Sequence, residues 1–237
     1  MGSDLVRAAA ALGLLLGLGV AGAGFLVADG FHAVRAADRY VTVKGFSERE
    51  VAANLAMWPI VFQVSGDDLA AVQGRLDAAA GKVQAFLAQR GFAAEEANVS
   101  SPRLTDLHAQ RFDANRPAER YLGEATVTLR SPRVDAVKLA MQESGELIKE
   151  GVALVRSYEY QTAFLYTGLE QIKPEMIAEA TKDARRAAEQ FAHDAGSDVG
   201  AIRKAQQGFF SVEDRDAFSP EFKKIRVVTT VEYFLDE

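Results

Sequence analysis

The hydrophobic and polar positions of the chain alternate in some stretches and recur at helical spacing in others. Residues 39–46 (RYVTVKGF) alternate apolar and polar side chains, which predicts a half-buried strand. Residues 50–64 predict a second, longer strand. Because Pro59 in its middle cannot donate a backbone hydrogen bond, we expect this strand at the edge of a sheet or with a bulge at the proline.

The first predicted helix follows these two strands. Asp67 or Asp68 is its expected N-cap, and Gly91 marks its end. Its apolar residues recur at helical spacing and predict the face that packs inward: Leu69, Val72, Leu76, Ala79, Val83, Phe86 and Leu87.

Elements of both kinds fill the rest of the chain. Two strands around a polar loop at 113–119 predict a hairpin. Ser131 and Pro132 predict the cap and the first residue of a short helix that ends at Gly145. The two strands of the hairpin are residues 99–112 and 120–130. Further strands are expected at residues 155–166, 201–212 and 224–235, and a long helix at residues 169–195.

The order strand-helix-strand-strand therefore occurs twice, at about residues 50–130 and 155–235. Such an order suits antiparallel sheets with helices packed on them. The predicted fold is one α+β domain of two similar halves at residues 39–237, preceded by an N-terminal membrane anchor and connector at residues 1–38.

The anchor is predicted from an unbroken apolar run. From Ala8 to Ala28 the chain has no charged or polar side chain. A membrane-spanning helix needs about 20 apolar residues, whereas the apolar part of a removable signal is about 7 to 15 residues long. We therefore expect one transmembrane helix through residues 8–28. A removed signal is the alternative, because Ala21-Gly22-Ala23 has the form of a cleavage site.

The orientation of the anchor does not follow from charge alone. Arg7 precedes the apolar run, while Arg35, Arg39 and Lys44 follow it, so a count of positive charges would keep the domain inside. Long folded domains are translocated largely regardless of charge. We expect a single-pass protein of the bacterial inner membrane with its C-terminal domain in the periplasm.

Composition excludes several classes of function. The net charge is −6 and the isoelectric point is about 5.3. Nucleic acid is therefore not an expected partner, since its binding depends on Lys and Arg. The chain has no cysteine, which excludes disulfides, thiolate nucleophiles and cysteine-ligated zinc.

The glycines of the apolar run fit helix packing better than cofactor binding. Residues 17–22 match GxGxxG, but that motif binds a dinucleotide only where a strand turns into a helix. No cofactor is expected. Gly13, Gly17 and Ala21 recur every four residues, so we predict that they let two spanning helices approach closely.

No catalytic or metal-binding motif is recognisable. His32, His108 and His193 are far apart, and none belongs to a closely spaced ligand set. Hydrolase and phosphate-binding motifs such as GxSxG and GxxxxGK[ST] are absent. We expect a protein that is not an enzyme, with no catalytic, cofactor-binding or metal-ligating residues.

Aromatic residues gather at a few places. Tyr158, Tyr160, Phe164 and Tyr166 are expected on one face of the 155–166 strand, packed under a helix, with a ligand groove or a subunit contact as alternatives.

The C-terminal strand has no proline or glycine and would be poorly protected at a sheet edge. The candidate residues of an oligomer interface are Trp58, Pro59, Phe209, Phe210, Ile225, Val227 and Val231.

Three stretches, residues 39–60, 197–216 and 223–235, resemble the SIMPL-domain family of exported bacterial proteins. The pairs Lys44-Gly45, Trp58-Pro59 and Gln207-Gly208 carry the resemblance. It implies a periplasmic or membrane-associated α+β domain, often linked with tolerance of oxidative or envelope stress and sometimes with ring-like homo-oligomers. It implies no catalytic residues.

The leading hypothesis is a non-catalytic, membrane-anchored, envelope-facing protein that self-assembles into a homo-oligomer and supports stress tolerance. A periplasmic ligand-binding module is the alternative, with an unknown small molecule. An uncharacterised hydrolase is the third possibility, because catalytic residues can converge from distant positions.

Overall fold

The computed structural model describes residues 13, 16–26, 39–109, 117–156 and 159–236. The protein has a mixed α/β fold with antiparallel strand pairing. Its contacts divide it into two compact units. Unit 1 comprises the described parts of Met1–Glu48, Lys173–Ser211 and Arg226–Glu237, and unit 2 comprises those of Arg49–Ile172 and Val212–Ile225.

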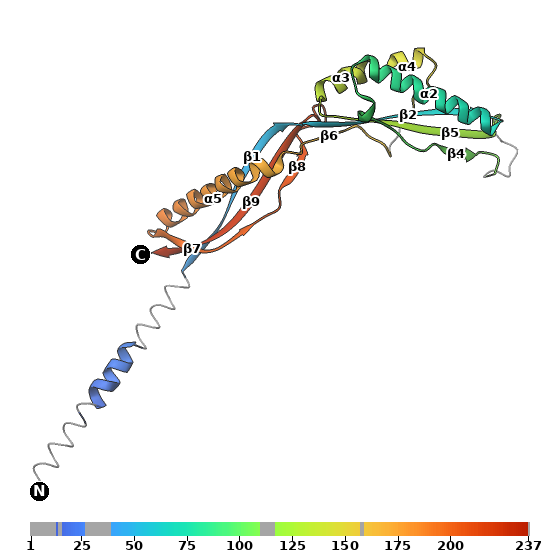
Figure 1. Ribbon diagram of the computed structural model, residues 1–237. Coiled ribbons are helices and arrows are strands. Elements are labelled where there is room, and N and C mark those ends of the chain that lie inside the picture. Colours follow the sequence, from blue (N-terminus) through green and yellow to red (C-terminus); the bar gives the residue numbers. More distant parts are fainter. Residues whose placement is uncertain (1–12, 14–15, 27–38, 110–116, 157–158, 237) are drawn as a thin grey trace, which may run out of the picture. The chain divides into compact units, whose positions relative to one another are not determined.

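Unit 2 contains a five-stranded sheet with helices on one face (Figure 1). The strand order is β3-β5-β2-β6, and β4 also pairs with β5. Its elements are β2 (Leu55–Gly66), α2 (Leu69–Gln89), η1 (Ala94–Glu96), β3 (Ala97–Val99), β4 (Arg103–Asp106), β5 (Tyr121–Ser131), α3 (Val134–Glu143), α4 (Gly145–Lys149) and β6 (Ala163–Leu165).

Helix α2 confirms the helix predicted from the apolar spacing. The Asp68 carboxylate caps it by accepting a hydrogen bond from Ala71 N at 2.7 Å. Gly91 follows the C-terminus with φ 77°, a left-handed conformation that favours glycine. The predicted inward residues are buried against Phe62 and Val127 of the sheet, except that Leu69 in the first turn is exposed.

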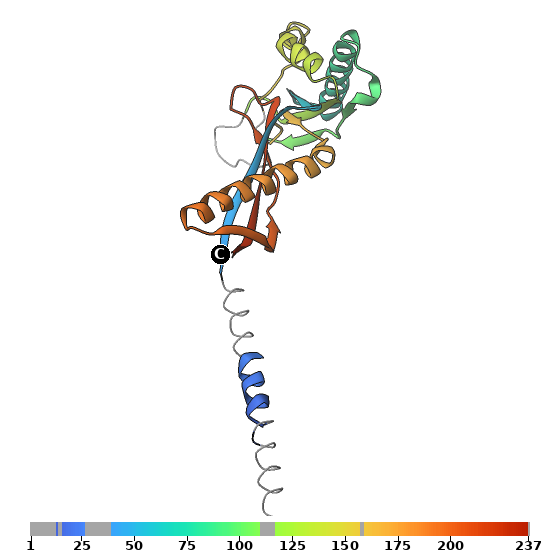
Figure 2. The ribbon, with the colours of Figure 1, turned by 90° about the vertical axis from the view of Figure 1, so that its left-hand side faces the viewer.

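Unit 1 contains the greater part of a second sheet and its helix. The elements of this sheet and its helix are β1 (Tyr40–Ala52), α5 (Leu169–Asp194), β7 (Asp198–Gln207), β8 (Ser211–Asp214) and β9 (Phe222–Asp236). Of these, β8 belongs to unit 2 except for Ser211. The strand order is β1-β9-β7, with β8 also paired to β9. Helix α5 lies on this sheet (Figures 1 and 2).

A stripe of small residues brings α5 unusually close to β1. The buried residues of the helix recur every four positions: Met176, Ala180, Ala184, Ala188 and Ala192. Opposite them lies Gly45, where a Cβ atom would be 2.8 Å from the Cα of Ala184 and closer still to Ala180 O and Ala184 N. Only glycine fits at this position, because the atoms it meets belong to the helix backbone.

The predicted strand at 50–64 is divided in the structure. β1 continues to Ala52, and β2 begins at Leu55. The prediction that Pro59 lies at a sheet edge or in a bulge is wrong, because β2 lies between β5 and β6 and pairs with β5 in continuous register. The proline is accommodated because β6 pairs only with residues 55–57.

Two other predicted strands are mostly replaced by irregular structure. The 99–112 strand consists of the end of β3 and the short β4, separated around Pro102, although the predicted hairpin with β5 is confirmed. Part of its polar loop, 110–116, lies outside the described residues. Of the described part of the 155–166 strand, only Ala163–Leu165 is extended in a ladder, and it pairs with β2. The strand beside α5 is β1 instead.

Smaller corrections concern element ends. The cap of α3 is Arg133 rather than Ser131, whose hydroxyl accepts a hydrogen bond from Arg133 N, and Gly145 opens α4 instead of ending a helix. The 201–212 strand is divided at residues 208–210 into β7 and β8. The helix predicted at 169–195 and the strand predicted at 224–235 are confirmed as α5 and β9.

The predicted anchor at residues 8–28 lies partly outside the described residues. Residues 13 and 16–26 are helical, and Gly13, Gly17 and Ala21 are exposed there. Within the part of the chain that the structure describes, no helix is long and apolar enough to cross a membrane.

Candidate functional site

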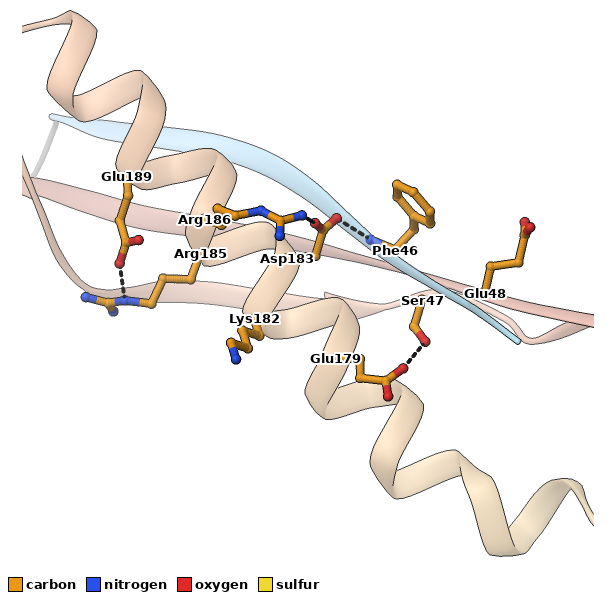
Figure 3. Close-up of a pocket in the computed structure, with 9 residues that line it drawn as sticks. All are labelled: Phe46, Ser47, Glu48, Glu179, Lys182, Asp183, Arg185, Arg186 and Glu189. Atoms are coloured by element: carbon orange, nitrogen blue, oxygen red, sulfur yellow. Dashed lines mark hydrogen bonds and ion pairs between the residues drawn. The ribbon is translucent and has the colours of Figure 1, made fainter. Parts of the chain in front are cut away.

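A group of charged residues surrounds a hollow in unit 1, between β1 and α5 (Figure 3). Phe46 N donates to Asp183 Oδ2 at 3.1 Å, and the Ser47 hydroxyl donates to Glu179 Oε2 at 2.6 Å. Asp183 also pairs with Arg186. Strand β1 lies at the edge of its sheet. The two carboxylates therefore accept hydrogen bonds from a backbone N–H and a hydroxyl that would otherwise face solvent.

The hydrogen bonds beside this hollow of about 600 Å³ therefore hold helix α5 against strand β1. Its other charged groups include the exposed pair Arg185 Nε and Glu189 Oε1, 3.0 Å apart. Among the residues that the structure describes, no cluster of three or more His, Asp and Glu side chains could hold a metal ion. The arrangement stabilises the α5–β1 contact.

The histidines stand apart in the structure as well. His108 Nε2 lies 3.0 Å from Pro117 O, and His193 is an exposed residue near the end of α5. His32 lies outside the described residues.

The outer strand of the unit 1 sheet, β7, is a candidate interaction surface. None of its ten residues is buried, and it pairs on one side with β9. Ile202 in its middle is half exposed, and Phe209, in the turn that follows, is fully exposed. An outer strand open on both faces presents backbone groups to which another strand can bind.

Of the seven residues proposed for an interface, four are buried within the chain: Trp58, Ile225, Val227 and Val231. Pro59 and Phe210 are partly buried, which leaves Phe209 as the fully exposed member. β9 is central in its sheet, so it is not the unprotected edge considered from the sequence. The sequence gives no indication that β7 is a candidate interface, because the strand mixes apolar and polar residues without a regular pattern.

The predicted aromatic row does not form one face of a strand. Phe164 is buried in β6, Tyr160 is 38% exposed, and Tyr166 is partly buried. Tyr158 lies outside the described residues. Tyr160 instead borders a groove of about 730 Å³ in unit 2.

This groove, called the Trp58 groove below, is the second candidate site. Its walls come from β2, from α3 and α4, and from the chain between β6 and α4. The residues that line it are Trp58, Pro59, Ile60, Val61, Met141, Ser144, Ile148, Leu154, Val155, Arg156, Tyr160, Gln161 and Thr162. Its volume is in the range of about 300–1,000 Å³ typical of small-molecule sites.

An ion pair elsewhere in unit 2 joins α3 to the start of β9. Lys138 pairs with Glu221, whose backbone carbonyl accepts from Ala53 N at 2.7 Å. The hydrogen bond from Lys138 holds the pKa of the Glu221 carboxyl below its ordinary value of 4.5. These contacts tie three segments of unit 2 together.

Comparison with known proteins identifies the family of the whole folded region. Among curated proteins, none matches the chain. A family model described as SIMPL, a protein of unknown function (DUF541), matches residues 41–233. This match spans β1 to β9 and most of the chain, and so the protein belongs to the SIMPL family.

Proposed function

We propose that the protein is a non-catalytic, membrane-anchored, envelope-facing protein that assembles into a homo-oligomer through its folded domain and supports stress tolerance. The observation that carries the proposal is the outer strand β7, which has no buried residue along its ten positions.

The anchor is supported by the apolar run from Ala8 to Ala28 and by the exposure of its described part. Within residues 16–26, the large apolar side chains are 62–73% exposed: Leu16, Leu18, Val20, Phe25 and Leu26. Exposed apolar area on this scale is unfavourable in water and is covered by a membrane or by another protein. An inner-membrane location with the domain in the periplasm accounts for it.

Assembly through β7 is supported by the difference between the two edge strands of its sheet, β1 and β7. One outer strand, β1, is protected where Asp183 accepts the hydrogen bond of Phe46 N. The other, β7, carries the exposed Ile202 and leads to the exposed Phe209. A strand of a second copy placed along β7 would extend the sheet, and a head-to-tail contact of this kind closes into a ring when the rotation permits.

The test is the native mass of the full chain in mild detergent. We expect multiples of the 25.6 kDa chain mass and a shift toward monomer in the Ile202→Lys variant, because a lysine on an outer strand opposes strand pairing. Leu139→Lys is the matched control, since Leu139 is an exposed apolar residue of α3 in unit 2. A wild-type protein that is monomeric at micromolar concentration contradicts the proposal.

The alternative function, a ligand-binding module, has its support in the Trp58 groove. Its volume and its mixture of aromatic, aliphatic and polar walls suit a small organic molecule.

A further inference from the structure

The Trp58 groove opens where the ladder beside β2 is interrupted. On this side, β6 pairs with β2 as far as Met57. The next bonds join Gln63 N to Ala153 O at 3.1 Å and Val155 N to Val61 O at 2.9 Å. Pro59 lies between the two groups of bonds.

The proline accounts for the opening. Backbone groups of alternate strand residues point to the same side, so position 59 faces the same neighbour as positions 61 and 63. Pro59 has no N–H to donate there. Arg156 and residues 160–162 consequently lie outside the ladder, and the space beside Pro59 is the groove that they line.

The walls of the groove combine apolar area with one charge. Trp58, Met141 and Ile148 supply aromatic and aliphatic surface, and Ile148 is 61% exposed. Arg156 is the single charged residue among those that line the groove. Within the described residues, no carboxylate is paired with its guanidinium.

We propose that the Trp58 groove binds a small amphipathic carboxylate. The apolar body of the ligand lies against Trp58, Met141 and Ile148, and its carboxylate pairs with Arg156. The guanidinium is planar and matches a carboxylate with two parallel hydrogen bonds, so it sets both the charge and the orientation of the ligand. The apolar walls add affinity that a free inorganic anion would not gain.

Charge complementarity selects this class over others. A cationic ligand of the same shape would meet Arg156 without any lining carboxylate to offset the repulsion. A neutral alcohol would keep the apolar contacts but lose the charge-assisted hydrogen bonds, which are about twice as strong as neutral ones.

The experiment uses the fluorescence of Trp58, the only tryptophan of the chain and a wall of the groove. The full chain in dodecyl maltoside is titrated with 3-phenylpropionate, 3-phenylpropanol and 3-phenylpropylamine, with calorimetry as a second readout. The three probes share one apolar body and differ in charge. We expect 3-phenylpropionate to bind at least about tenfold more tightly than the alcohol and the amine to bind weakest.

Two variants and one control locate the site. Arg156→Gln should weaken binding of the carboxylate by about tenfold or more and remove its advantage over the alcohol. Ile148→Glu places a like charge on an exposed wall and should abolish carboxylate binding. Arg130→Gln is the matched control, because Arg130 is an exposed arginine of β5 that does not line the groove and should bind like the wild type.

The proposal is overturned if the alcohol binds as tightly as the carboxylate, if Arg156→Gln binds like Arg130→Gln, or if no probe is bound in calorimetry. None of these results depends on the oligomeric state. The native mass of the same samples therefore tests assembly separately.

Discussion

Replacing Gly45 by alanine should destabilise unit 1 strongly, because this residue sets the distance between β1 and α5. An added Cβ would lie 2.8 Å from the Cα of Ala184 and closer to Ala180 O and Ala184 N. Carbon atoms in contact are normally about 3.5–4.0 Å apart. The strand and the helix would have to separate by about 1 Å, because all three atoms that the Cβ would meet belong to the helix backbone and not to a flexible side chain.

The expected cost has two parts. Overpacking of this kind typically costs about 1–3 kcal/mol. A separation of 1 Å would also weaken the bonds from Phe46 N to Asp183 and from the Ser47 hydroxyl to Glu179, each worth about 1 kcal/mol at a partly exposed site. We therefore expect Gly45→Ala to lower the free energy of unfolding by about 3–5 kcal/mol.

Urea unfolding of the full chain, followed by far-ultraviolet circular dichroism, measures this change. Gly81→Ala is the control: Gly81 lies within α2, nothing lies within 4 Å of its added Cβ, and alanine should stabilise that helix by about 0.5–1 kcal/mol. The same chemical change thus has opposite expected signs at the two positions. A Gly45→Ala variant with the urea midpoint of the wild type would refute the close-packing argument.

Two other predictions concern unit 2. Asp68→Ala should cost about 1 kcal/mol in urea unfolding, because Ala71 N loses its acceptor at the start of α2, and an unchanged midpoint would contradict the capping role. Lys138 lowers the pKa of Glu221, so the pair stabilises the fold above pH 4.5, and this stability is lost as the pH falls through the lower folded-state pKa. In melting curves between pH 7 and pH 3, Lys138→Met should weaken this pH dependence, by at most about 1 kcal/mol, whereas the exposed Lys149→Met should not.

Helices α2 and α5 were predictable from the sequence because their signals are local. In α2, the Asp68 cap, the spacing of apolar residues and Gly91 all lie within one segment, and each determines backbone geometry on its own. The end of α5 at Gly196, with φ 68°, follows the same logic. Leu69 departs from its predicted burial, as the residues of the first turn, 69–71, are all exposed.

The strand partners could not be predicted in the same way. Alternation shows which face of a strand is buried but not which strand lies beside it. The C-terminal strand, β9, is flanked by β1 and by β7, although β1 lies at the opposite end of the sequence. One outer strand of the sheet is consequently β7, whose sequence, DVGAIRKAQQ, has no regular apolar pattern.

Residues 155–166 have the sequence pattern of a strand but do not form the strand that it predicts, and some of them line the Trp58 groove instead. Their aromatic alternation predicts a long strand, yet among those of them that the structure describes only residues 163–165 join a ladder. A strand needs a neighbour that can exchange hydrogen bonds, and Pro59 of β2 cannot donate at the facing position. The signal for the Trp58 groove was therefore present as two separate facts: a proline within one strand pattern and an aromatic strand pattern with no assigned neighbour. Their combination predicts an opening in the sheet, and the lone charge of Arg156 then determines which ligand the opening favours.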